Sequence, residues 1–298
     1  MQSPGSLPVT NGLSRPAVYG AAFAPLAAPL RSTMYSRFLR RSLSVSQMDL
    51  EFAVFQLLMA CRSPARVYKL TQHRKQTKNQ YARDDPAFAA VVGVLVSVCA
   101  VAYGVAYEYT SPLAYGWLVL QAWLNFVGGG ALIATACWAI ANKYMRASMP
   151  LPHSVEQEVE WLYAWDVHCN SYVPVLLLIF AAQLPLLPLL MRDGFLPALL
   201  GNTLYAAAAV HYIYITFSGY LSAYAMMRQQ YHNVSCAQQR CITTPFLAIL
   251  LYHVYAVLPF LQRQNLFLAP IGVIAVLYLL LVILQVNVAR IVLGLFVA

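Results

Sequence analysis

The feature that most constrains this chain is a series of uncharged apolar stretches, each about as long as a bilayer is thick. A hydrocarbon core of about 30 Å requires a helix of roughly 20 apolar residues. The chain is 60% hydrophobic and 10% charged, whereas soluble domains carry about 25% charged residues. The sequence therefore predicts an all-α polytopic membrane protein and excludes a water-soluble core as its main architecture.

Five or six helices are expected to cross the membrane. The expected spans are 87–107, 114–141, 173–191, 196–225, 242–261 and 266–289. Asp84, Asp85 and Pro86 precede the first span and suit a helix start, because carboxylates cap free N–H groups and proline fits the first turn. Pro185 and Pro188 predict a kink in the third span.

Basic residues gather before the first span, and their position predicts the topology. Twelve of the nineteen Lys and Arg residues precede residue 84. The positive-inside rule places such an excess in the cytosol, together with the polar loop 143–172. The side of the carboxy terminus is only weakly determined, since the late loops carry one or two basic residues each.

The chain divides into three regions. Residues 1–46 contain no acid and are expected to be a disordered tail, although an Arg-rich, acid-free start also resembles a mitochondrial transit peptide. Met34 is an alternative start. Residues 47–86 are expected to form a cytosolic basic and interfacial helical region, because the apolar run there is too short to span. Residues 87–298 form the expected transmembrane helix bundle.

The basic segment before the first span is a candidate docking site. Seven basic residues and no acidic one occur between Arg62 and Arg83. The simplest interpretation is contact with anionic lipid headgroups, which attract juxtamembrane Lys and Arg. A protein docking surface and RNA binding stay open as alternatives, although one interleaved aromatic and no RNA-binding module make RNA the weaker one. The candidate residues are Arg74, Lys75, Lys78 and Arg83.

A second candidate stretch precedes the third expected span. Glu160, Asp166 and His168 invite a metal or acid–base interpretation. On a helix, however, Trp161, Trp165 and His168 share one face, which is typical of an interfacial aromatic belt. A partner-binding surface is the alternative. No second histidine stands at ligand spacing, so neither catalysis nor a metal or cofactor is expected, and the protein is not predicted to be an enzyme.

The expected spans carry polar neutral residues but no acid or lysine near a midplane. Charges inside a membrane usually mark function, so their absence argues against proton-coupled transport. Asn125, Asn202 and His211 are the polar positions that a lipid or small-solute transporter could use. A continuous polar cavity reaching all three would favour that function over a packed scaffold.

Four long sequence blocks identify a family. They are QMDLEF (47–52), RKQTKNQYARDDPAF (74–88), EWLYAWDVHCNSYVP (160–174), and GNTLY with YIYITFSGY (201–205 and 212–220). In this order they resemble the Unc-fifty family of Golgi membrane proteins. The chain departs from the family pattern at 1–33, which look like an extension, and at 225–257, where about 35 residues look inserted by comparison with the family pattern.

The resemblance implies a Golgi scaffold with about five spans that acts in vesicle-mediated protein transport. Family members are linked to recruiting exchange factors for Arf-type GTPases and to cell-surface transport of receptors. An RNA-binding role at the inner nuclear membrane is also implied, and the endoplasmic reticulum is a further possible location. The resemblance is strongest at two stretches expected on one side of the membrane. Arg74, Lys75, Lys78 and Arg83 are therefore predicted to form one composite docking surface with Glu160 and Asp166.

Overall fold

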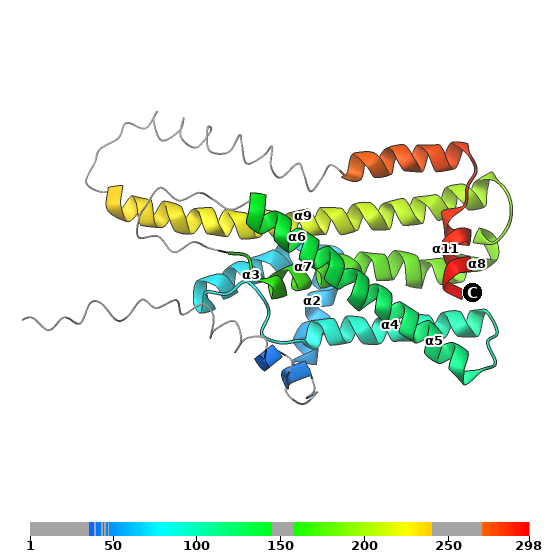
Figure 1. Cartoon of the computed structure of the whole chain (residues 1–298), viewed down its shortest axis with the longest axis horizontal. Helices are drawn as coiled ribbons and strands as arrows, with labels where there is room; N and C mark the ends of the chain where they lie inside the picture. The colour runs from blue at the N-terminus through cyan, green and yellow to red at the C-terminus, as the bar shows by residue number, and fades with distance from the viewer. Residues whose placement is uncertain are drawn as a thin grey trace, which may run out of the picture.

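The computed structural model describes residues 36–38, 40–42, 44, 46, 48–144, 158–239 and 270–297 (Figure 1). These residues form helices and connecting turns, with no strand among them. The predicted all-α class is therefore confirmed. Of the expected tail, residues 36–38 and 40–42 are helical. The expected span 242–261 lies outside the described residues.

Within the described ranges, four helical stretches are long and apolar enough to cross a membrane. The first is α4 (Ala87–Ala106). The second comprises α5 (Pro112–Trp123), η2 (Leu124–Gly129) and α6 (Gly130–Tyr144). The third comprises α7 (Trp161–Val175), η3 (Leu176–Ala182) and α8 (Gln183–Leu190). The fourth is residues 195–226 of α9 (Phe195–Gln239).

The carboxy-terminal part of the described chain is bent. Pro270–Ile283 and Val288–Phe296 of α11 (Val288–Val297) meet at 97°. The expected window 266–289 therefore contains this break, and its residues 266–269 lie outside the described residues. The backbone N–H groups of Gln285 and Val286 donate to carbonyls in the last turn of the first helix. Gln285 has a φ of 54°, a left-handed conformation that cannot continue a right-handed helix. Counting the bent pair as one span gives five.

The third span begins at Trp161, twelve residues before the expected start at 173. The polar residues of 160–172 had suggested a loop, but most of them find partners inside the protein: Asp166, His168, Asn170 and Ser171 are all buried. A polar residue can lie inside a helix bundle when its hydrogen-bonding groups are satisfied there. The expected loop 143–172 is therefore helical from Trp161 onward.

Two short helices precede the bundle. α2 (Leu50–Arg62) begins at Asp49, whose carboxylate accepts the N–H of Phe52 at 2.9 Å. α3 (Pro64–Lys78) begins with a proline, which suits the first position of a helix, and the Ser63 side chain makes no capping bond. α3 ends at Asn79, which has a φ of 54°, the left-handed conformation that ends many helices.

α7 is the central helix of the bundle, and it packs against α9, α6, α2 and α4. The long helices lie side by side along the horizontal axis of Figure 1, with α3 at one end and α11 at the other. On α4 and α5 many outward apolar side chains are exposed, among them Val94, Val98 and Leu120. Large exposed apolar surfaces mark contact sites, among them those with a membrane, so in a membrane protein this surface is expected to face lipid.

Candidate functional site

The two candidate docking stretches meet at the end of the bundle that carries α3. Glu160, the residue before α7, receives two backbone N–H groups from the turn between α3 and α4. These come from Tyr81 at 3.3 Å and Ala82 at 3.0 Å. Burial raises the pKa of Glu160, and the two N–H groups and Lys75 oppose that rise. The carboxylate therefore fixes this turn against the start of α7.

Arg83 and Asp166 form the buried part of this site, and each is 6% exposed. The backbone N–H of Arg83 donates to Oδ2 of Asp166 at 2.6 Å, and Nη1 of Arg83 lies 3.6 Å from Oδ1. Nη2 of Arg83 donates to Oδ1 of Asn170 at 2.7 Å. The guanidinium also lies over the Phe88 ring at 4.2 Å. Isolated buried charges are very costly, so these contacts hold the loop before α4 in one place.

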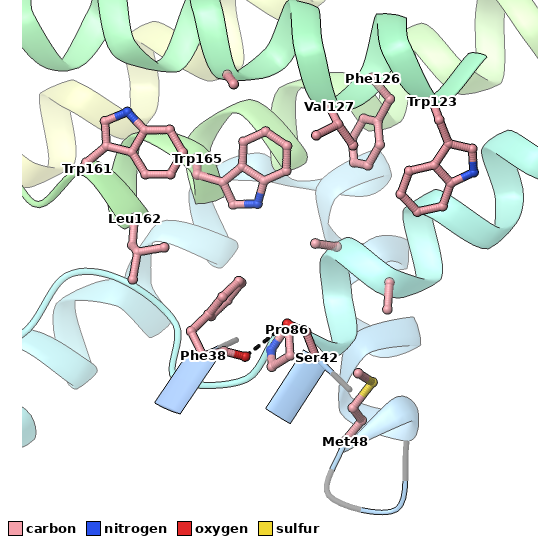
Figure 2. Close-up of a pocket in the computed structure, with 13 residues that line it drawn as sticks. Phe38, Ser42, Met48, Pro86, Trp123, Phe126, Val127, Trp161, Leu162 and Trp165 are labelled. Carbon is pink, nitrogen blue, oxygen red and sulfur yellow. Dashed lines mark hydrogen bonds between the residues drawn. The ribbon is translucent and has the colours of Figure 1, made fainter. Parts of the chain in front are cut away.

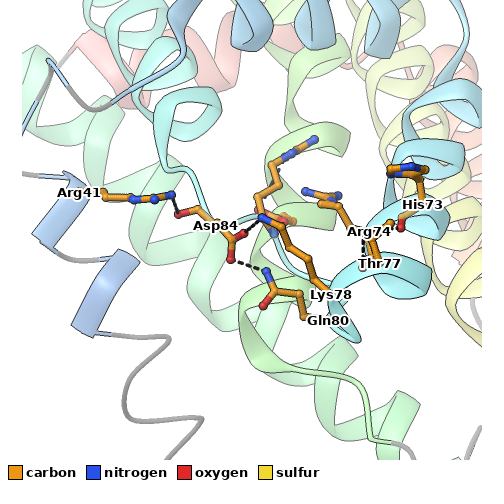
Figure 3. Close-up of polar contacts among 9 residues, drawn as sticks. Arg41, His73, Arg74, Thr77, Lys78, Gln80 and Asp84 are labelled. Carbon is orange, nitrogen blue, oxygen red and sulfur yellow. Dashed lines mark hydrogen bonds and ion pairs between the residues drawn. The ribbon is translucent and has the colours of Figure 1, made fainter.

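Around Asp84 the contacts are more exposed (Figure 3). Its carboxylate accepts Lys78 Nζ and Gln80 Nε2, and its carbonyl accepts Arg41 Nη1 at 3.3 Å. Burial alone would raise the pKa of Asp84, but the hydrogen bonds and the positive charge of Lys78 lower it. These contacts connect the last turn of α3 to the residues that precede α4.

Arg74 and Lys75 are half-buried rather than fully exposed. Arg74 donates to Oγ1 of Thr71 at 2.9 Å, and the Lys75 ammonium lies 4.2 Å from the centre of the Tyr81 ring. Burial lowers the pKa of both side chains, although nearby acidic groups partly oppose this. Their charges therefore contribute to the fold as well as to the surface.

The exposed face of this end of α3 is narrower than the predicted composite surface. It consists of His73, Gln76, Thr77, Lys78 and Asn79. The structure brings the two predicted stretches together, but Arg83 and Asp166 bind each other inside the protein and so are not surface for a partner. For the other predicted residues, Arg74, Lys75, Lys78 and Glu160, the docking role stays a prediction.

His168 lies inside the bundle, not in an interfacial belt. Its Nδ1 is 2.8 Å from Tyr212 Oη and its Nε2 is 3.1 Å from the Phe126 carbonyl oxygen. A carbonyl only accepts, so Nε2 carries the proton and Nδ1 accepts from Tyr212. The imidazole packs directly against Gly130, where a Cβ would overlap the ring. Neither Tyr212 nor Phe126 was predicted, and of the three consecutive glycines 128–130 only Gly130 packs against the ring.

The two tryptophans stack on each other with ring centres 6.3 Å apart. Trp161 Nε1 donates to Thr135 Oγ1 at 2.9 Å. Both rings also line an apolar pocket beside α4 (Figure 2). No local sequence pattern predicts this pocket, because its walls come from five separate segments.

The polar positions that a transporter could use do not share a site. Asn125 and His211 are exposed, whereas Asn202 is buried. The Asn202 amide donates to the Val286 carbonyl at 2.8 Å and accepts the Val288 N–H at 3.0 Å. Asn202 thus binds the bent carboxy-terminal pair. Within the part of the chain that the structure describes, no group of three His, Cys, Asp or Glu residues could hold a metal ion.

Comparison with known proteins agrees with the four sequence blocks. The model of the UNC-50 family matches residues 38–245 and 240–297. These two segments meet inside 225–257, where an insertion was inferred. No solved structure matches the chain.

Three relatives are named as Unc-50 proteins. The Dictyostelium discoideum homolog is 35% identical over 251 residues, which is 84% of this chain and 82% of that protein. The Homo sapiens homolog is 40% identical over 62% of this chain and 70% of its own length. Caenorhabditis elegans unc-50 is 36% identical over 66% of this chain and 64% of its own length. With four or five candidate membrane-spanning helices among its described residues, the chain belongs to the UNC-50 family.

Proposed function

We propose that this chain is a multi-pass scaffold of the Golgi membrane, without catalytic activity of its own, that acts in vesicle-mediated protein transport. It recruits a cytosolic exchange factor for Arf-type GTPases and supports the transport of receptors to the cell surface. Membership of the UNC-50 family supports the assignment. The docking surface is the exposed end of α3, namely His73, Gln76, Thr77, Lys78 and Asn79.

The observation that carries the proposal is the way in which this exposed end is held. The buried contact of Arg83 and the partly buried contact of Glu160 fix the turn after α3 to the central helix α7. Tyr68, in the middle of α3, donates to the Ile215 carbonyl of α9 at 2.8 Å. A short polar helix has little intrinsic stability in water, so these contacts supply its rigidity. A rigid binding surface loses less entropy on association than a flexible one.

The position of α2 relative to the membrane also favours an accessible end of α3. Its outward side chains Leu50, Phe52, Val54, Phe55 and Leu58 are exposed by 44% to 61%. A helix too short to span, with an apolar outer face, is expected to lie in the membrane interface. α3 follows it directly, with Arg66 and Lys69 exposed near its beginning. The polar end of α3 would therefore stand just outside the headgroups, where a cytosolic protein can reach it.

An exchange of two side chains tests the docking surface. Gln76→Lys combined with Lys78→Gln keeps composition and net charge but changes the shape of the exposed end. The matched control exchanges two exposed cations near the start of the same helix, Arg66→Lys with Lys69→Arg. Each variant is expressed in cells that lack the endogenous protein, and the Golgi-bound fraction of an Arf exchange factor is measured beside an organelle marker.

The first exchange is expected to abolish most of the recruitment while the control retains it, with both variants inserted and located in the Golgi. Normal recruitment by both exchanges would mean that the basic residues serve only lipid contact, and docking at α3 would be rejected. A wild-type chain that resides elsewhere than the Golgi would overturn the location itself.

A further inference from the structure

A pocket of about 410 Å³ opens beside the start of α4. Its size is within the range of about 300 to 1,000 Å³ typical of ligand sites. The helical residues around Phe38 cover it, and α4, the second span and the start of α7 form its walls (Figure 2). The lining is almost wholly apolar: Phe38, Ser42, Met48, Pro86, Ala89, Ala90, Trp123, Phe126, Val127, Ala131, Trp161, Leu162 and Trp165.

The pocket is continuous with the lipid-facing surface of the bundle. Trp123 and Val127 line it, and both are also exposed, by 37% and 38%. They belong to the same outward apolar surface as Leu120 and Leu124 of the second span. Lipid tails are as apolar as leucine side chains, and they are the apolar molecules that surround a membrane protein. An acyl chain can therefore enter the pocket sideways without crossing water.

One polar group in the wall indicates that the ligand carries a hydrogen-bond acceptor. Trp123 Nε1 donates to Ser97 Oγ and Trp161 Nε1 to Thr135 Oγ1, each at 2.9 Å. The structure gives Trp165 Nε1 no partner among the described residues, and Figure 2 shows this nitrogen on the side of the ring that faces the pocket. Partly buried indole N–H groups usually find an acceptor. An ester carbonyl of a lipid is such an acceptor.

The charge around the pocket favours an anionic headgroup. Between residues 36 and 85 the chain carries ten Lys or Arg and four Asp or Glu, a net charge of +6. Three of the ten, Arg37, Arg40 and Arg41, lie in the helical residues that cover the pocket, beside Phe38 and Ser42 of its lining. Anionic lipids attract juxtamembrane basic segments of this kind.

We propose that the pocket binds one acyl chain of an anionic glycerophospholipid. The chain lies against Met48, Phe126 and Leu162, its ester carbonyl accepts the N–H of Trp165, and its phosphate lies beside Arg37, Arg40 and Arg41. This lipid holds the residues around Phe38 against the bundle. The proposal does not depend on recruitment of a trafficking factor and can fail separately from it.

Native mass spectrometry of the full chain in detergent tests the proposal. The chain is stripped of lipid and titrated with dioleoyl phosphatidylserine, with dioleoyl phosphatidylcholine, and with a phosphatidylserine whose chains carry ether links instead of esters. Diester phosphatidylserine is expected to bind more tightly than either of the other two. Loss of one hydrogen bond weakens binding by about fivefold, which is the expected difference between the ester and ether lipids.

Two pairs of variants localise the binding. Ala90→Phe fills the pocket and is expected to lower affinity by about tenfold or more, since several apolar contacts are lost. The control is Val94→Phe, one turn further along α4, where the Val94 side chain is 61% exposed on the lipid-facing side. Trp165→Phe removes the unpaired N–H and should bind ester and ether lipids equally. Trp161→Phe removes an N–H that Thr135 already accepts and should keep the ester preference.

Equal lipid binding by the Ala90→Phe variant and the wild type overturns the proposal, provided that both unfold at the same temperature. The same spectra report other occupants. A dimer that Ala90→Phe dissociates, with no loss of lipid, would assign the pocket to a second copy. If Ala90→Phe instead exposes the amino-terminal 35 residues to protease without loss of lipid, the chain's own segment fills the pocket. Either result would reject the lipid as the occupant of the pocket.

Discussion

Arg83 and Asp166 lie 83 positions apart in the sequence, and the backbone N–H of Arg83 donates to the Asp166 carboxylate at 2.6 Å inside the protein. The same two residues form an ion pair in which each side chain is less than a tenth exposed. The first residue belongs to the turn before α4 and the second to the middle of α7. The pair therefore connects the basic region to the bundle, and it determines how α3 is presented.

Removal of the buried carboxylate should strongly destabilise the protein. Asp166→Asn keeps an acceptor for the Arg83 N–H but leaves the guanidinium buried without a counter-charge. Breaking a buried pair in this way costs about 3 to 5 kcal/mol, so the apparent unfolding temperature in detergent should fall by several degrees or more.

The control for this variant is an exposed pair at the opposite end of the bundle. Arg290 contacts Asp193, whose side chain is 89% exposed, and exposed pairs contribute little. Asp193→Asn should leave the unfolding temperature nearly unchanged. An equal and small effect of both variants would show that the Arg83 contact does not anchor α3.

Gly130 should tolerate no side chain, unlike its neighbour Gly129. A Cβ at Gly130 would overlap the His168 ring, whereas a Cβ at Gly129 meets nothing within 4 Å. Gly130→Ala should therefore destabilise by about 1 to 3 kcal/mol through overpacking. Gly129→Ala should be neutral or slightly stabilising, because alanine favours helices.

The role of the imidazole is tested in a second background. In a His168→Ala protein the overlap is gone, so Gly130→Ala should cost much less than in the wild type. The destabilisation by Gly130→Ala is measured by thermal unfolding in the same detergent. Equal destabilisation in both backgrounds would show that it does not arise from overlap with His168.

The sequence predicted the elements that depend on local pattern. α4, the second span and α9 lie close to their expected positions, because an apolar stretch of bilayer length has few other solutions in a membrane. α3 begins at Pro64 and lies within the region 47–86 that was expected to be helical.

The site was less predictable, because its partners are distant in the sequence. Charge and aromatic spacing identified Arg83, Asp166 and His168, but nothing local indicates that Asn170 accepts from Arg83 or that Tyr212 binds His168. The start of α7 was misplaced for the same reason. A run with Asp, His and Asn resembles a loop until the groups that satisfy them are known.

Asn202 should stabilise the bent carboxy-terminal pair. Its side chain bonds both to Val286, after the first helix, and to Val288, at the start of α11. Asn202→Leu leaves those two backbone groups without a partner, at a cost of about 1 to 3 kcal/mol. Hydrogen exchange at the Val288 amide should become faster. Asn125→Leu, at an exposed position, should leave that exchange unchanged, and no difference between the two variants would contradict the role.

The amino terminus and the connection after Tyr144 should lie on the same side of the membrane. α4 and the second span pack against each other in antiparallel order, so the chain returns to the side from which it started, and the positive-inside rule makes that side the cytosol. An epitope at Met1 and another inserted after Tyr144 should both be digested by protease outside sealed Golgi vesicles, while an epitope inserted between α4 and α5, after Thr110, should be protected. The reverse pattern would place the exposed end of α3 in the lumen, where no cytosolic exchange factor could bind it, and would contradict the docking function together with the topology.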